Sequence, residues 1–320
     1  MHKLVVILGT NASGKSDLGI RLARHFGGEI VSADSRQVYR GLDLGSGKIT
    51  PAQAAIVKHH LIDVAEVNEY YSLAQYQRAA YAAIDSIANT GKLPFLVGGS
   101  GLYIRAIVEG YQLLDVPPNH PLRTELESLP LPQLVARLEQ SDPAAALRID
   151  QSNRRRLIRA IEISSAGYAN SAAHQNAPRY ECLQLGLTWP REILVERIEA
   201  RLRERLAHGM ITEVAELRSR SVSDLRLDKL GLEYRYITRY LRRELPTLDD
   251  LHSQLGIAIR QFAKEQLTWF KRDQRITWLN PFGDYFQEAR TRIQEWRNKW
   301  GDRRDLNPRQ PDPQSGALTN

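Results

Sequence analysis

Eight residues close to the N-terminus have the types and spacing of a phosphate-binding loop. An apolar run from Leu4 to Leu8 ends at a glycine, and a Gly-x-x-x-x-Gly-Lys-Ser pattern then leads into a segment with helical spacing. This order of strand, loop and helix is the context in which the pattern binds phosphate. The pattern therefore predicts a ligand that carries a diphosphate, held by Gly9, Thr10, Asn11, Ala12, Ser13, Gly14, Lys15 and Ser16.

The chemistry of this loop depends on four of its residues. Gly9 and Gly14 let the backbone curl so that N–H groups point inward, and the helix that starts near Lys15 adds its positive end. The Lys15 ammonium supplies a mobile positive charge. The Ser16 hydroxyl can bind a magnesium ion, Mg2+, that bridges phosphate oxygens. The loop does not reveal which diphosphate it holds, and ATP is the first candidate for this nucleotide-binding motif.

One carboxylate stands directly at the end of a predicted strand. Asp34 closes the segment 29–34 and is followed by Ser35, Arg36 and Gln37. In an open α/β sheet the ligand lies beyond the carboxyl ends of the strands, so Asp34 should face the phosphate loop. It can act as a magnesium ligand or as a general base, and the structural alternative is an Asx-turn or a helix cap.

The next predicted strand, 92–99, ends without an acidic residue. It runs into Gly98-Gly99-Ser100-Gly101, where a P-loop nucleotide hydrolase is expected to carry a magnesium-binding aspartate. This difference weakens the NTPase interpretation without excluding it. It also places Ser100 in the same crevice as Asp34.

The elements that position these residues alternate between strands and helices. The predicted strands are 4–8, 29–34, 92–99, 183–189 and 276–279. Helical spacing follows the phosphate loop, begins again after Ser72, returns from Arg191 and covers 248–271. This order predicts an α/β fold in which a parallel sheet, as in P-loop NTPases, is flanked by helices on both faces.

A segment without a recognisable strand interrupts this order after a proline-containing stretch at 115–121. Residues 115–179 have helical spacing, and we interpret them as an inserted all-helical domain. Arg155 and Arg159 share one face of a helix within it. The core is then discontinuous, comprising 1–114 and 180–300, and the polar tail 301–320 is expected to be disordered.

A basic row lies on the helix predicted from residue 191. Arg197, Arg201 and Arg205 recur every four residues beside an apolar row. They either lie beside the core or form a solvated face, paired with neighbouring glutamates at i,i+3 and i,i+4. For Arg197 and Arg205 individually, the solvated face is the favoured interpretation.

The composition indicates a globular protein with an excess of positive charge. Its 320 residues include 44 Lys and Arg against 37 Asp and Glu, so the formal net charge is +7. A polyanionic partner and a solvated basic surface both explain this excess. The one cysteine, Cys182, fits a reducing compartment, and no stretch has the length of a membrane span. We therefore expect a cytoplasmic protein with no membrane partner.

Several motifs together resemble one enzyme family. They are the phosphate loop, Ile-Val-Ser-Ala-Asp-Ser-Arg-Gln-Val-Tyr (30–39), Leu-Val-Gly-Gly-Ser-Gly-Leu-Tyr-Ile-Arg (96–105), Arg-x-x-Arg-Ala-Ile-Glu (156–162) and Ala-Lys-x-Gln-x-Thr-Trp-Phe (263–270). With these motifs the chain resembles the bacterial type of the tRNA dimethylallyltransferase family, also called tRNA isopentenyltransferases or IPP transferases. The resemblance extends from about residue 4 to residue 279.

The resemblance implies transfer of a dimethylallyl group from dimethylallyl diphosphate to tRNA. The acceptor would be the exocyclic amine of the adenosine on the 3′ side of the anticodon, and the products isopentenyladenosine and diphosphate. Asp34 would be the general base, Ser100 would position the reactants, and Lys15, Arg201 and a Mg2+ at Ser16 would stabilise the departing diphosphate. The anticodon stem-loop of the tRNA would contact Asp34, Ser35, Arg36, Gln37, Ser100, Arg155, Arg156 and Arg159.

Some positions depart from the pattern of the family. Asn11 and Ser100 stand where Thr is usual, Arg155 replaces Gln, and Gly231-Leu232-Glu233-Tyr234 replaces Gly-Ile-Gly-Tyr, which puts local contacts in question. The zinc finger of eukaryotic relatives is absent, and we expect a monomer. Three rival functions remain: a small-molecule kinase, a tRNA-binding protein without catalysis, and a prenyltransferase that acts on free adenylate.

Overall fold

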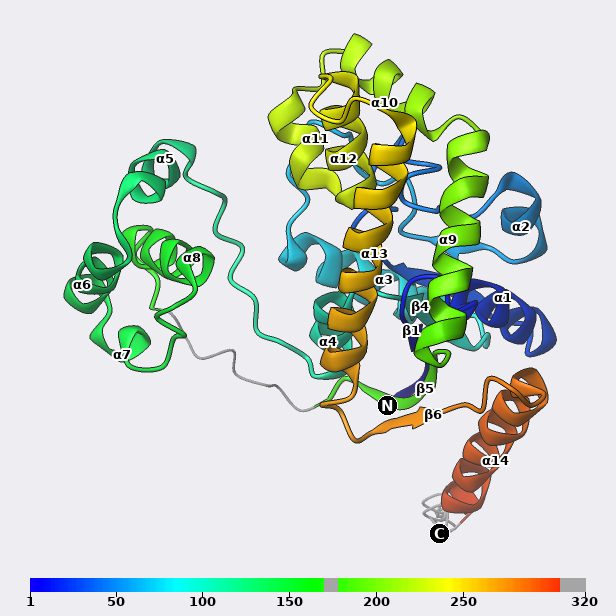
Figure 1. The fold of residues 1–320 in the computed structure, drawn as a ribbon. Helices are drawn as coiled ribbons and strands as arrows, with labels where there is room; N and C mark the ends of the chain where they lie inside the picture. The colour runs from blue at the N-terminus through cyan, green and yellow to red at the C-terminus, as the bar shows by residue number, and fades with distance from the viewer. Residues whose placement is uncertain (170–177, 306–320) are drawn as a thin grey trace, which may run out of the picture.

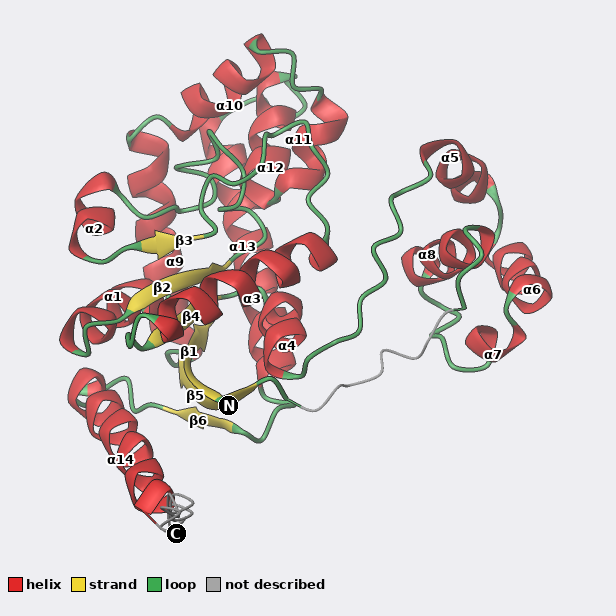
Figure 2. Cartoon of the chain, turned by 180° about the vertical axis from the view of Figure 1, so that it is seen from behind, coloured by secondary structure: helices red, strands yellow, loops and turns green. Residues whose placement is uncertain are grey.

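A parallel β-sheet forms the centre of the protein (Figures 1 and 2). The computed structural model describes residues 1–169 and 178–305. In spatial order the sheet comprises β3 (His59–His60), β2 (Glu29–Ala33), β4 (Pro94–Gly98), β1 (His2–Gly9), β5 (Tyr180–Leu187) and β6 (Ile276–Trp278). Every pairing between neighbouring strands is parallel. The predicted α/β fold with a parallel sheet is therefore confirmed.

Alternating side chains give the sheet two apolar faces, each covered by helices. Leu4, Val6 and Leu8 of β1 pack on one face against α3 (Leu73–Asn89) and α4 (Gly101–Val108). Val5 and Ile7 pack on the other face against α1 (Lys15–His25) and α14 (Tyr285–Asp305). Both faces are buried, as an all-parallel sheet requires. The register aligns Leu8 and Ala33 with Gly98, so β1, β2 and β4 end at the same edge.

A layer of helices covers this carboxyl edge of the sheet. It consists of α9 (Arg191–Ala207), α10 (Met210–Ser219), α11 (Asp224–Leu230), α12 (Leu232–Leu241) and α13 (Leu248–Phe270). These helices share one apolar cluster with Val38, Leu42 and Val67, which flank the short helix α2 (Pro51–Ile56) in the chain. In Figure 1, α9 and α13 run from the sheet to α10, α11 and α12.

The insertion forms a separate group of helices to one side of the sheet (Figures 1 and 2). It contains α5 (His120–Ser128), α6 (Leu131–Ser141), α7 (Pro143–Ala146) and α8 (Arg154–Ser165). Leu126, Leu134, Leu138 and Leu157 form an apolar core of their own. The described part of 115–179 has no strand, as predicted, whereas residues 170–177 lie outside the described residues.

The structure corrects several element boundaries. Strand β2 ends at Ala33, before Asp34, and β4 runs only from Pro94 to Gly98. Strand β5 runs from Tyr180 to Leu187 and excludes Trp189, whose side chain donates a hydrogen bond to the phosphate loop. Helix α14 continues to Asp305, so residues 301–305 do not belong to the tail predicted at 301–320, and 306–320 lie outside the described residues. The sequence signal for α14 is weak because few of its residues, among them Ala289 and Ile293, are apolar and buried. No helix in the described ranges is long and apolar enough to cross a bilayer.

Candidate active site

The phosphate-binding loop between β1 and α1 is held in shape through its carbonyl groups. Ala12 and Gly14 have left-handed φ angles of 57° and 94°. The Ala12 carbonyl accepts a hydrogen bond from Arg197 Nε at 2.8 Å, and the Ser13 carbonyl accepts one from Trp189 Nε1 at 2.9 Å. These contacts keep the loop curled around the position where a phosphate group would bind.

Gln266 of α13 joins this loop to the end of β4. Its Oε1 accepts a hydrogen bond from the Asn11 backbone N–H at 2.8 Å, and its Nε2 donates one to the Gly99 carbonyl at 2.9 Å. The backbone N–H of Asn11 is therefore bound within the protein and is not available to a ligand. Gln266 belongs to the motif at 263–270, which by itself predicts no role for this side chain.

A cavity of about 520 Å³ opens where β1, β2 and β4 end. It is lined by most of the predicted site residues: Asn11, Ala12, Lys15, Ser16, Asp34, Ser35, Arg36, Gln37, Ser100, Arg155 and Arg201. The other members of the phosphate loop, Gly9, Thr10, Ser13 and Gly14, are not among its lining residues in the described chain. Thr10 and Ser13 are buried behind it, and a Cβ at Gly9 would collide with the Leu187 carbonyl.

The Asp34 carboxylate is fixed on one side and open on the other. Its Oδ1 accepts hydrogen bonds from the backbone N–H groups of Arg36 at 2.8 Å and Gln37 at 3.4 Å. This is an Asx-turn, so the structural alternative foreseen for Asp34 is present. Oδ2 receives no hydrogen bond from the residues that the structure describes, and Asp34 lines the cavity. The turn therefore orients a carboxylate oxygen that is free to accept a proton.

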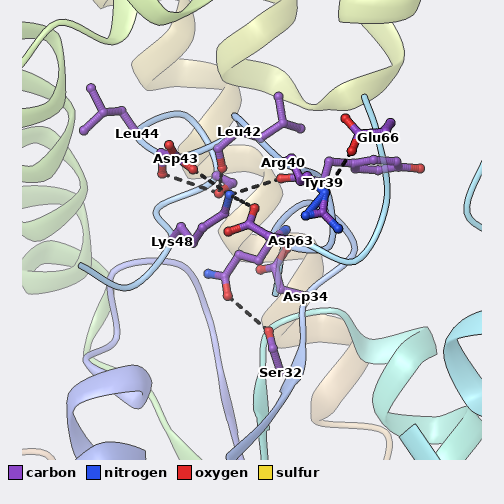
Figure 3. A network of polar contacts seen from close by, with 12 residues as sticks. Ser32, Asp34, Tyr39, Arg40, Leu42, Asp43, Leu44, Lys48, Asp63 and Glu66 are labelled. Carbon is purple, nitrogen blue, oxygen red and sulfur yellow. Dashed lines mark hydrogen bonds and ion pairs between the residues drawn. The ribbon is translucent and has the colours of Figure 1, made fainter. Parts of the chain in front are cut away.

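The chain beyond Asp34 is tied to the end of β4 and to a neighbouring loop. The Ser35 backbone N–H donates to Ser100 Oγ at 3.1 Å, which links the ends of β2 and β4. Ser32 Oγ donates to Gln37 Oε1 at 3.1 Å (Figure 3), and Gln37 Nε2 donates to the Gly47 carbonyl at 3.2 Å. The Gln37 side chain is thus partly used to hold the loop around Gly47.

That loop, residues 43–48, forms a wall of the cavity through Gly45, Ser46 and Gly47. Figure 3 shows how Lys48 anchors it. The buried Lys48 ammonium lies 2.5 Å from Asp43 Oδ1 and 2.5 Å from Asp63 Oδ1, and it donates to the Tyr39 carbonyl at 3.1 Å. Two carboxylates around one buried ammonium fix the end of the loop. Sequence reasoning assigned no role to this segment.

Three cations converge on the cavity from two helices. Lys15 comes from α1, and Arg201 and Arg205 come from α9. Removal from water lowers the pKa of Lys15 to about 8, and the charge of Arg201 adds to this effect while Asp34 opposes it. Removal from water, with the nearby charge of Arg205, also lowers the pKa of Arg201 to about 10. An anionic ligand would stabilise the charged forms of these crowded cations, so the cavity favours binding of an anion.

The solvated face favoured for Arg197 and Arg205 is wrong for Arg205, whereas Arg197 is exposed but binds the phosphate loop in place of a neighbouring glutamate. Arg197 is bound to the phosphate loop and lies over the Trp189 ring, 4.9 Å from its centroid. Arg205 lines the cavity with only 15% of its side chain exposed, and its ion-pair partner is Glu233 of α12. The recurrence of arginines every four residues beside an apolar row is compatible with a buried site, but ion pairs with nearby glutamates explain the same spacing equally well.

The arginines predicted to bind tRNA divide into two groups. Arg155 is exposed and lines the cavity from the insertion. Arg156 is largely exposed, 4.0 Å from Asp150, and is not among the residues that line the cavity in the described chain. Arg159 donates to the Val116 carbonyl at 2.8 Å and pairs with buried Glu162, so part of its charge supports the insertion itself. Of the three arginines of the insertion, the structure therefore joins only Arg155 to the cavity, which Arg36 also lines from the core.

Further residues line the cavity, and sequence reasoning assigned no role to most of them. Arg36 Nη1 donates to the Lys229 carbonyl at 2.9 Å, which ties the chain beyond Asp34 to α11. Phe262 also lines the cavity, and its side chain is exposed. The remaining members are Val97, Gly98 and Gly99 at the end of β4, and Ile198, Leu202, Lys229, Gly231, Leu232, Glu233, Arg235, Ile259 and Glu265. The second group comes from α9, α11, α12 and α13 and from the junction of α11 and α12, which are far from the phosphate loop in sequence.

The fold and this cavity define an α/β protein with a phosphate-loop motif, a carboxylate and several cations in one site. A family model described as IPP transferase matches residues 37–273. The tRNA dimethylallyltransferase 2 of Shewanella sediminis is 41% identical over 290 residues, covering 89% of this chain and 96% of that protein. The corresponding protein of Citrifermentans bemidjiense is 43% identical over 290 residues, covering 89% and 93%.

A solved structure agrees with these sequence matches. The full-length tRNA isopentenylpyrophosphate transferase from Bacillus halodurans superimposes with a TM-score of 0.71 and 34% identity, over 94% of this chain and 100% of that chain. The chain belongs to the IPP transferase family.

Proposed function

We propose that this protein is a tRNA dimethylallyltransferase. It transfers a dimethylallyl group from dimethylallyl diphosphate to the exocyclic amine of the adenosine on the 3′ side of the anticodon. The observation that carries the proposal is the single cavity that joins Asp34 to the phosphate loop and to Lys15 and Arg201. Membership of the family supports the same reaction.

The cavity contains the groups that such a displacement needs. The adenosine nitrogen attacks the allylic carbon, the carbon–oxygen bond to the diphosphate breaks, and the diphosphate leaves with the bonding electrons. Asp34 accepts the proton that the amine loses, through the carboxylate oxygen that the Asx-turn leaves open. Ser100, tied to the Ser35 amide, holds the edge of the site at which the two reactants meet.

Charge on the departing diphosphate is stabilised by cations and by the phosphate loop. The Lys15 ammonium donates to the Thr10 carbonyl at 3.1 Å, so a phosphate oxygen can replace that carbonyl without a large movement. Arg201 and Arg205 approach from α9 on another wall of the cavity. Groups placed before the reaction stabilise the transition state without the cost of reorganising water.

The residues present fit a Mg2+ ion that takes most of its ligands from the diphosphate and from water. Ser16 lines the cavity and would supply its hydroxyl. The described residues contain no group of three His, Cys, Asp or Glu side chains able to hold a metal on their own. When bound, Mg2+ would neutralise charge on the leaving diphosphate.

The acceptor adenosine must leave its stack to reach Asp34. Ser35, Arg36 and Gln37 follow Asp34 along the lining and would contact this base, while Arg155 would approach the RNA backbone from the insertion. Exposed Arg156 and partly exposed Arg159 would add contacts outside the cavity. We propose a monomer acting in the cytoplasm, in keeping with one free thiol, Cys182, and with RNA as substrate.

One experiment tests the proposal against its rivals. The protein is incubated with labelled dimethylallyl diphosphate and unmodified tRNA, with ATP as a parallel donor. Label that enters tRNA supports the proposal, whereas phosphate transfer from ATP would indicate a kinase and binding without product would indicate a tRNA-binding protein. An anticodon stem-loop and free AMP are compared as acceptors, and preference for AMP would indicate an adenylate prenyltransferase.

A further inference from the structure

Glu233 places a carboxylate inside the cationic part of the cavity. Its Oε1 lies 3.7 Å from Arg205 Nη1, and both side chains are 15% exposed. Lys15, Arg201 and Asp34 line the same cavity. The separation is too long for a hydrogen bond, so Glu233 neutralises Arg205 without holding it tightly.

The backbone that carries Glu233 is fixed. Gly231 begins the segment with a φ of 148°, and the next aromatic residue, Tyr234, is buried. The Tyr234 hydroxyl donates to Glu213 Oε1 at 2.8 Å. Glu213 also accepts three backbone N–H groups of the loop at 43–45, at 2.6 to 3.1 Å. These contacts fix the backbone next to Glu233 at the wall of the cavity.

The negative charge of Glu233 repels the diphosphate that the cations of the cavity attract. Lys15, Arg201 and Arg205 would bind diphosphate both in the substrate and as the product. Equally tight binding of both does not accelerate the chemical step, and a product that is held tightly slows turnover.

We propose that Glu233 competes with diphosphate for Arg205 and so limits how tightly the site holds the expelled product. This inference rests on the proposed function. A bound diphosphate takes Arg205 from Glu233, and departure of the diphosphate restores the ion pair. The carboxylate thus determines the affinity of the site for its leaving group, while Asp34 acts on the acceptor.

The test measures binding of inorganic diphosphate to the full chain by titration calorimetry, with Mg2+ present. Glu233→Gln keeps the shape of the side chain and removes its charge, and it should lower the Kd for diphosphate about tenfold. Inhibition of prenyl transfer by added diphosphate should strengthen to the same extent. The matched control is Glu216→Gln, which removes an exposed charge paired with Arg220 on α10 and should leave the diphosphate Kd unchanged.

A double-mutant cycle separates competition for Arg205 from a general effect of charge. In an Arg205→Gln background, Glu233→Gln should no longer tighten diphosphate binding. Equal tightening in both backgrounds, or unchanged or weaker binding in Glu233→Gln, would overturn the inference while the wild-type protein still prenylates tRNA. Failure of the wild-type protein to transfer the dimethylallyl group to tRNA would instead refute the proposed function.

Discussion

Gly47 offers a test of how the loop at 43–48 places the cations of the site. Its φ is 63°, and a Cβ built there would collide with the Arg205 guanidinium and lie 2.5 Å from Arg201 Nη2. Gly91 is a matched control, because its φ is 78° and a Cβ there meets nothing within 4 Å. Alanine at either position meets the same backbone strain, but only Gly47→Ala displaces the arginines.

The magnitudes of the two effects differ enough to be separated. Alanine in the left-handed region costs about 1 kcal/mol, or about 2 °C in Tm for a chain of this size. Displacement of preorganised charge-stabilising groups costs about 10²-fold in rate. We therefore expect similar Tm values for Gly47→Ala and Gly91→Ala, with a loss of about 10²-fold in kcat/KM for Gly47→Ala alone.

The assay is prenyl transfer to an anticodon stem-loop, with Tm measured by calorimetry on the same samples. If Gly47→Ala folds and keeps the wild-type rate, the close approach of this loop does not place Arg201 and Arg205 for catalysis. If Gly47→Ala loses far more stability than Gly91→Ala, the loop serves mainly to hold the fold together.

Three further predictions concern other parts of the site. Removal from water lowers the pKa of Lys15 to about 8, so the ammonium loses its proton as the pH rises through that value. The affinity for diphosphate, measured by calorimetry, should therefore fall above about pH 8. An affinity that stays level above this pH contradicts a role for the Lys15 charge. Asp34→Asn should lower turnover about 10²- to 10⁴-fold with little change in tRNA affinity, and surviving turnover would remove Asp34 as the base. Glu213→Ala leaves three loop N–H groups and Tyr234 without their acceptor, so unfolding by denaturant should show a loss of stability of about 2 kcal/mol or more, against about 1 kcal/mol for Tyr234→Phe.

The parts of the site that sequence predicts are those set by short stretches of chain. The phosphate loop and the Asx-turn at Asp34 are formed by residues adjacent in sequence. Helix α3 begins after Ser72, where helical spacing predicts its start, and a capping box of Ser72 and Gln75 fixes that start. The order of strands and helices likewise follows from local periodicity. These features can therefore be predicted from one sequence without a structure.

The remaining features depend on contacts between distant segments. Arg197 and Arg205 differ from ordinary surface arginines only because α9 packs beside the phosphate loop. Glu213 belongs to no recognisable motif. It accepts hydrogen bonds from backbone N–H groups of a loop about 170 residues earlier in the chain. Such pairings follow from tertiary packing, which a single sequence does not encode as a pattern of spacing.

The bridge made by Gln266 bears on how the protein matures during synthesis. The phosphate loop leaves the ribosome well before α13, but the Asn11 backbone N–H is bound by a side chain 255 residues later in the chain. The same side chain joins the loop to Gly99. A nascent chain thus has the loop's residues long before it has the loop's final geometry, and contacts of such long range form slowly. Substrate can stabilise the fold only once α13 has docked, so truncation before Gln266 should yield a chain that diphosphate does not protect from proteolysis.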